Sequence, residues 1–178
     1  MSSVEQTELR ALIVKVCAKS VSAVMSGGLD RSPHACCVTS EPYFIKWGDS
    51  YLHHDAATQE YVYSQAIQDP TAPRVPKVYD CFGHDRITYL VMEYTQSSPP
   101  RGNTYFYQQT ANAIDWLLRI PVPSGAEIGP IGGGYACHSV FKDWTAPLRF
   151  TSNEALEIFL NKVRFSLCAS GGSFTVGL

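Results

Sequence analysis

The sequence predicts an α+β fold in which an antiparallel sheet carries one crossing helix and is followed by further helices. Three features support this prediction. Apolar residues recur at helical spacing over residues 5–19. Two short β-prone runs flank residues 39–42 as the arms of a hairpin. A dense run of β-branched and aromatic residues over 87–94, bounded by polar turn residues, indicates a strand.

In the first half of the chain, periodicity and turn residues predict the elements. They are a helix over 5–19, strands over 35–38 and 43–47, a helix over 54–68, an extended segment over 75–82 and a strand over 87–94. The first helix has acidic residues early and lysines late, as the helix dipole prefers. The second helix is expected to end before Asp69-Pro70, because helices usually stop ahead of a proline.

The second half predicts helices separated by irregular chain. Residues 105–120 form a helix with one apolar face. That face holds Ala111, Ile114, Leu117 and Leu118. Residues 121–134 are crowded with proline and glycine and cannot form a regular element. Ser152 is the expected N-cap of a helix over 154–163, and the tail from 166 shows no periodic pattern.

Composition excludes two classes of partner. The 178 residues carry 14 basic and 16 acidic side chains, a net charge of −2, without the basic excess of a nucleic-acid binder. No apolar run approaches the roughly 20 residues that span a bilayer, so no membrane partner is expected. Residues 1–10 are polar and acidic, unlike the basic start of a signal peptide.

The cysteines indicate a reduced, cytoplasmic protein. The six are scattered and form no C-x-x-C pair, and the adjacent Cys36 and Cys37 are too strained to bridge each other. A secreted disulfide framework has a denser set in a shorter chain. The five histidines do not lie at zinc-ligand spacings from the cysteines, so no metal site is expected.

Lys46 is the first candidate functional residue. It lies in the short apolar strand Tyr43-Phe44-Ile45-Lys46-Trp47, where alternation lets an ammonium group project from the sheet into a cleft. An ammonium in such a place suits the phosphates of a nucleotide. The alternative is an edge-strand lysine that points into solvent.

Two acids on the predicted helix 54–68 could orient and neutralise that lysine. They are Asp55 and Glu60, five positions apart and therefore roughly 140° apart around a helix. Only one of them can face Lys46, and the sequence does not decide which. The alternative is a solvated helix face on which Asp55 is a first-turn acid.

The strand Tyr89-Leu90-Val91-Met92-Glu93-Tyr94 runs into a Ser/Pro loop. A strand that ends in this way has the form of a hinge, where free backbone carbonyl and N–H groups can pair with an adenine edge. The alternative is a plain core strand.

The order of these features is more specific than any one of them. The chain has, in this order, the lysine strand, the acidic helix, Val75-Pro76-Lys77-Val78-Tyr79 and the hinge strand. This order resembles the N-terminal lobe of the aminoglycoside phosphotransferase and choline kinase-like group, which has a protein-kinase-like fold. The chain is similar to fungal members in particular, over about residues 35–163. Further similar stretches are 55–63, 69–79, Gly129-Pro130-Ile131-Gly132-Gly133-Gly134, His138 with 141–143, and 154–161.

The resemblance implies a site for ATP and magnesium. Lys46 would contact the α- and β-phosphates, and Asp55 falls on the family's glutamate with a side chain one methylene shorter, with Glu60 as the second choice. A phosphate loop is expected near residues 26–32, which hold two glycines. The family reaction would be phosphorylation of a hydroxyl on a small molecule.

The resemblance also implies an adenine subsite. Met92 would line the base pocket, and Glu93 to Thr95 would supply the hydrogen bonds to the base.

Phosphoryl transfer also needs an Asp beside the substrate hydroxyl, an Asn and a second Asp on the metal. In the family these follow the hinge, as His-x-Asp with Asn five residues after the Asp. His53-His54-Asp55 lies before the hinge, and His138 is followed by Ser139-Val140. Asp115 lies in the apolar helix pattern, and Asp143 has no Asn at the required place. No catalytic residue is therefore assigned.

The expected organisation is a kinase-like N-terminal lobe over 1–96, a linker and helical segment over 97–163, and an irregular tail over 164–178, with the catalytic lobe absent. Such a truncated lobe would be inactive and would bind nucleotide weakly or not at all. Its exposed lobe interface, including helix 105–120, would favour self-association. The alternatives are a non-catalytic nucleotide- or protein-binding module and an unrelated α+β interaction protein.

Overall fold

The structure, a computed structural model, describes residues 3–26, 36–96, 104–138, 141 and 144–169. It confirms the α+β class, since the described residues form helices and an antiparallel sheet. The chain divides into two compact units, Met1–Pro123 (unit 1) and Ser124–Leu178 (unit 2). Among the described residues, no helix is long and apolar enough to cross a membrane.

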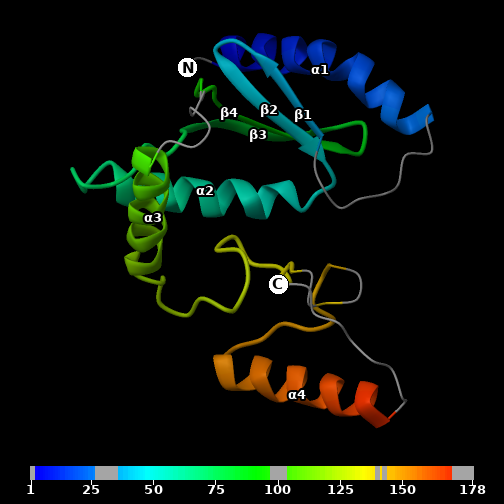
Figure 1. Cartoon of the computed structure of the whole chain (residues 1–178). Helices are drawn as coiled ribbons and strands as arrows, with labels where there is room; N and C mark the ends of the chain where they lie inside the picture. Colours follow the sequence, from blue (N-terminus) through cyan, green and yellow to red (C-terminus); the bar gives the residue numbers. More distant parts are fainter. Residues whose placement is uncertain (1–2, 27–35, 97–103, 139–140, 142–143, 170–178) are drawn as a thin grey trace. The chain divides into compact units, whose positions relative to one another are not determined.

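The sheet of unit 1 has four antiparallel strands (Figure 1). They are β1 (Cys36–Ser40), β2 (Tyr43–Gly48), β3 (Val78–His84) and β4 (Ile87–Glu93), in the spatial order β1-β2-β4-β3. The predicted hairpin is confirmed, with Ser40 opposite Tyr43 across the turn. The extended segment predicted from residue 75 becomes a strand only at Val78, and a register irregularity follows between Val78 and Asp80.

Helices cover both faces of this sheet (Figure 1). α1 (Ser3–Ser26) lies on one face, and α2 (Leu52–Ala66) lies on the other. α1 is longer than the predicted 5–19, and its apolar stripe continues to Val21, which packs against the same core. α2 begins two residues earlier than predicted and ends before Asp69-Pro70, as expected.

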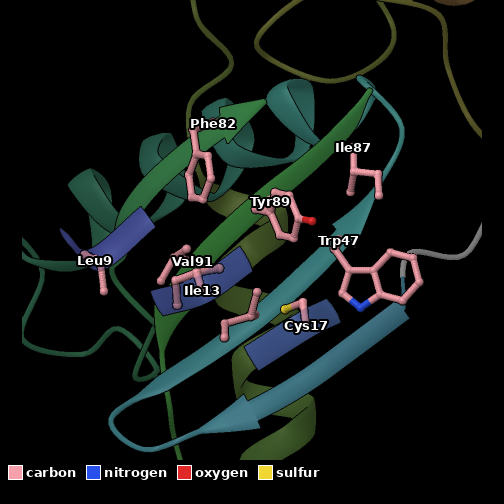
Figure 2. Packing of buried hydrophobic residues seen from close by; sticks show 9 residues of the cluster. Leu9, Ile13, Cys17, Trp47, Phe82, Ile87, Tyr89 and Val91 are labelled. Carbon is pink, nitrogen blue, oxygen red and sulfur yellow. The ribbon is translucent and has the colours of Figure 1, made fainter. Parts of the chain in front are cut away.

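Strand alternation divides the apolar residues between two cores. The α1 core consists of Leu9, Ile13, Cys17, Ile45, Trp47, Phe82, Ile87, Tyr89 and Val91 (Figure 2). The first three recur every four residues and so form one stripe of α1. The α2 core consists of Leu52, Ala56, Leu90 and Met92. Because β4 contributes to both cores, six of its seven residues are buried.

A charged contact also fixes α1 to the sheet. The guanidinium of Arg10 donates two hydrogen bonds to the buried carboxylate of Asp80, at 2.7 and 3.0 Å, and lies 5.1 Å from the ring centre of Phe82. Gln6 donates a third, longer bond of 3.4 Å to the same carboxylate. The hydrogen bonds to Asp80 raise the pKa of Arg10 above its ordinary value.

The turn between β3 and β4 has a backbone conformation that suits glycine. Asp85 and Arg86 have φ angles of 48° and 66°, the left-handed pair that a tight hairpin turn requires. Residues with a Cβ atom are disfavoured there. We expect Arg86→Gly to raise the free energy of unfolding by about 0.5–1 kcal/mol, measured by urea unfolding.

The control is Lys15→Gly, which removes the same charge from an exposed position inside α1. There glycine should cost about 1 kcal/mol, because it loses more backbone entropy in a helix. Destabilisation by Arg86→Gly would contradict the assignment of a left-handed turn.

α3 (Thr104–Arg119) matches the predicted helix 105–120 within one residue. It is attached to the rest of unit 1 through Trp116, whose buried indole donates a 2.8 Å hydrogen bond to Asp69. Thr71 donates two hydrogen bonds to the same carboxylate, and these lower the pKa of Asp69. The hydroxyl of Tyr61 donates to the carbonyl of Pro121 just after the helix.

Unit 2 is built around aromatic residues and α4 (Asn153–Ala169). Phe141, Ala146 and Phe150 are buried together. Ser152 is the N-cap, as predicted, since its hydroxyl accepts a 3.2 Å hydrogen bond from the N–H of Ala155. α4 extends beyond the predicted residue 163. Residues 121–134 contain no helix or strand, as predicted.

Candidate functional site

Lys46 lies on an internal strand, so the alternative of an edge-strand lysine is wrong. Its neighbours across the sheet are Cys37 on β1 and Leu90 on β4. Ile45 and Trp47 point into the α1 core, so alternation places Lys46 on the face that α2 covers. The side chain is 35% exposed there. The ammonium group is therefore held at the sheet but remains accessible from solvent.

The acid that faces this ammonium is Asp55. Its Oδ2 atom lies 4.0 Å from Nζ of Lys46, and its side chain is 41% exposed. Glu60 lies further along α2 and is exposed. The pair is loose, and an exposed ion pair of this length contributes at most about 0.5 kcal/mol to stability. Asp55 can therefore orient Lys46, and an anion can still compete with Asp55 for the ammonium group.

A thiol and an imidazole, which sequence patterns did not predict as part of the site, lie near this pair. Lys46, Leu90 and Cys81 lie opposite one another across β2, β4 and β3. Sγ of Cys81 is 3.3 Å from Nδ1 of His53, in the first turn of α2. Burial, followed by the nearby carboxylates, raises the pKa of Cys81 to about 11, so the thiol stays protonated at neutral pH. Only the register of β3 against β4 could have revealed this position.

Met92 and Glu93 occupy different environments at the end of β4. Met92 is buried beneath α2 with Leu90. The carboxylate of Glu93 forms an ion pair with Arg74 and accepts a hydrogen bond from the backbone N–H of Lys77, and these contacts lower its pKa. This carboxylate is therefore occupied by contacts within the protein.

The backbone after Met92 is partly engaged as well. The N–H of Glu93 donates to the carbonyl of Lys77 at 2.8 Å, and the N–H of Tyr94 donates to the carbonyl of Pro42 at 3.0 Å. Of the donors predicted between Glu93 and Thr95, these two are already used. An adenine edge at this place would therefore have to pair with other backbone groups, such as the carbonyl of Glu93 and the N–H of Thr95.

Other predicted features lie away from this cluster or outside the described residues. Ser26 is the last residue of α1, and the rest of the expected phosphate loop, residues 27–32, is not described. Asp115 is exposed on α3, and residues 142–143 are not described. Among the described residues, no group of three His, Cys, Asp or Glu side chains is placed to hold a metal ion.

Comparison with known proteins assigns no family to this site. No family model, curated protein or solved structure matches the chain. The site itself combines an accessible ammonium, an acid beside it and a buried methionine under the same helix.

Proposed function

We propose that the sheet and α2 form a nucleotide-binding lobe of the kind found in aminoglycoside phosphotransferase-like kinases. Lys46 binds the phosphates of ATP, which carries its magnesium ion with it. Asp55 orients the ammonium group. The base lies at the end of β4, next to Met92, and pairs with the carbonyl of Glu93 and the N–H of Thr95.

One observation supports this proposal above the others. Lys46 lies on an inner strand, on the sheet face covered by α2, with Asp55 of that helix 4.0 Å away. A lysine that served only solubility would have no reason to be at an inner strand beneath a helix, because its charge loses part of its hydration there. A phosphate group would compensate this loss by a charge-assisted contact.

The proposal is for binding and does not include phosphate transfer by this chain. After Thr95 the sequence has one histidine, His138, which is followed by Ser139-Val140 and not by the His-x-Asp pattern. A proton acceptor for the substrate hydroxyl and the ligands for a metal ion are both needed for transfer. With a single accessible ammonium as its phosphate contact, unit 1 should bind ATP weakly, with a dissociation constant on the order of 0.1–1 mM.

Lys46→Ala is expected to weaken binding of magnesium ATP at least about tenfold, because the main phosphate contact is lost. Isothermal titration calorimetry and the shift in melting temperature with nucleotide measure this change. Lys15→Ala, on an exposed position of α1, is the matched control and should leave the affinity unchanged.

Adenosine separates the phosphate contact from the base contact. It should bind wild type and Lys46→Ala equally, since it lacks the group that Lys46 recognises. Equal affinity of both proteins for ATP would contradict the proposal, and so would the absence of any ATP-induced shift in the wild type at several millimolar nucleotide.

A further inference from the structure

The face of α3 opposite its anchor is apolar and uncovered. Tyr107, Ile114, Leu117 and Leu118 are 62%, 51%, 47% and 79% exposed. Trp116, the residue that attaches the helix to unit 1, is buried. At 100° per residue, Trp116 lies nearly diametrically opposite Ile114 and Leu118. The attachment of α3 to unit 1 therefore leaves this face free.

The spacing on this face is that of a helix-pairing seam. Tyr107, Ala111, Ile114 and Leu118 follow one another at intervals of four, three and four residues. This is the heptad pattern in which two helices interlock their side chains. The flanking positions carry little charge, because Asp115 and Arg119 are the only charged residues of α3. No repulsion between like charges therefore opposes pairing with an identical helix.

Residue sizes along the seam favour an antiparallel pair. In that arrangement Tyr107 faces Leu118 of the second copy, and Ala111 faces Ile114, so each small residue meets a larger one. In a parallel pair Ala111 would face Ala111 and leave a gap between two layers of larger residues. The antiparallel arrangement also opposes the dipoles of the two helices. It has the self-complementary form that a two-fold dimer requires, with each residue contacting its partner position twice.

We propose that α3 is a homodimer interface, and that a second copy of this chain covers the seam Tyr107, Ala111, Ile114 and Leu118 in antiparallel orientation. This inference does not depend on nucleotide binding, because the Lys46 site is on other elements of unit 1. It identifies the residues and the geometry of the self-association expected from the sequence.

The area available fits a weak dimer. The four large apolar residues of this face expose on the order of 400 Å² together, so pairing two copies buries about 800 Å² of apolar surface, plus the polar flanks. Stable specific interfaces bury about 1,200–2,000 Å² in total, so the α3 pair lies at or below the lower end of this range. We therefore expect a concentration-dependent dimer with a dissociation constant on the order of 10–100 μM.

The test is sedimentation equilibrium of the full chain under reducing conditions, so that none of the six cysteines can link two copies. The wild type should pass from monomer to dimer across the micromolar range. Leu118→Glu should raise the dissociation constant at least about tenfold, because it places a carboxylate in the seam. Leu12→Glu, at a half-exposed leucine of α1, is the matched control and should dimerise as the wild type does.

A double variant tests the orientation. In Tyr107→Lys with Leu118→Glu, an antiparallel pair brings lysine opposite glutamate twice, so dimerisation should recover relative to Leu118→Glu alone. In a parallel pair the same changes would bring like charges together and weaken the dimer further. Failure of the double variant to recover would overturn the antiparallel geometry.

Three other outcomes would overturn the inference as a whole. The first is a wild-type chain that stays monomeric to several hundred micromolar. In that case the apolar face of α3 would be covered by another part of the same chain or would stay exposed to solvent. The second is a dimer that Leu118→Glu leaves intact. The third is loss of the dimer in Leu12→Glu as well, which would indicate unspecific association.

Discussion

Arg10→Ala is expected to lower the free energy of unfolding by about 2–3 kcal/mol, because it leaves the carboxylate of Asp80 buried without its main partner. Removing one member of a fully buried ion pair costs about 3–5 kcal/mol. The lower value is expected here because the side chain of Arg10 is half-exposed and solvent can partly replace it. Urea unfolding followed by circular dichroism measures the loss.

A double-mutant cycle isolates the pair. Asp80→Ala removes the buried charge together with its need for a partner, so Arg10→Ala and Asp80→Ala together should cost clearly less than the sum of the single changes. Arg119→Ala removes the same side chain from an exposed position of α3 and should cost no more than about 0.5 kcal/mol. Additive effects at Arg10 and Asp80 would show that the contact does not couple α1 to the sheet.

The sequence predicts local structure where periodicity and turn residues agree. The helix that ends before Asp69-Pro70, the N-cap at Ser152 and the strand from Ile87 all depend on contacts within a few residues, so they could be located directly. The end of α1 was placed too early at residue 19, because the stripe that packs on the sheet continues to Val21. The start of β3 was placed three residues early, because an extended chain becomes a strand only where a neighbour pairs with it.

The candidate site was predictable in part. Alternation along β2 places Lys46 on one face of the sheet. Helix geometry shows that at most one of Asp55 and Glu60 can face Lys46. Which acid faces Lys46 depends on how α2 is oriented on the sheet. That orientation is set by Leu52 and Ala56, which pack between α2 and the sheet. This is a tertiary property. The contact of Cys81 with His53 and that of Arg10 with Asp80 depend on cross-strand register, which sequence periodicity does not contain.

Phe150→Ala is expected to have the largest effect on unit 2, about 3–5 kcal/mol. The side chain of Phe150 is 1% exposed and packs between two other aromatic rings, with ring centres 6.2 Å from Phe141 and 5.3 Å from Phe159. Its backbone carbonyl accepts a 2.9 Å hydrogen bond from Ile128. Alanine would leave a cavity where the loops pack against α4, so both would lose part of their common packing surface.

A unit with so small a core cannot absorb this loss, because a short segment buries little apolar area beyond what offsets its conformational entropy. We expect the amides of Ile128 and Ala146, which both donate backbone hydrogen bonds within unit 2, to lose their protection from hydrogen exchange. Ile158→Ala removes an apolar side chain that is largely exposed on α4, and should leave that protection in place. If protection at Ile128 survives Phe150→Ala, unit 2 must be stabilised by something other than its aromatic cluster.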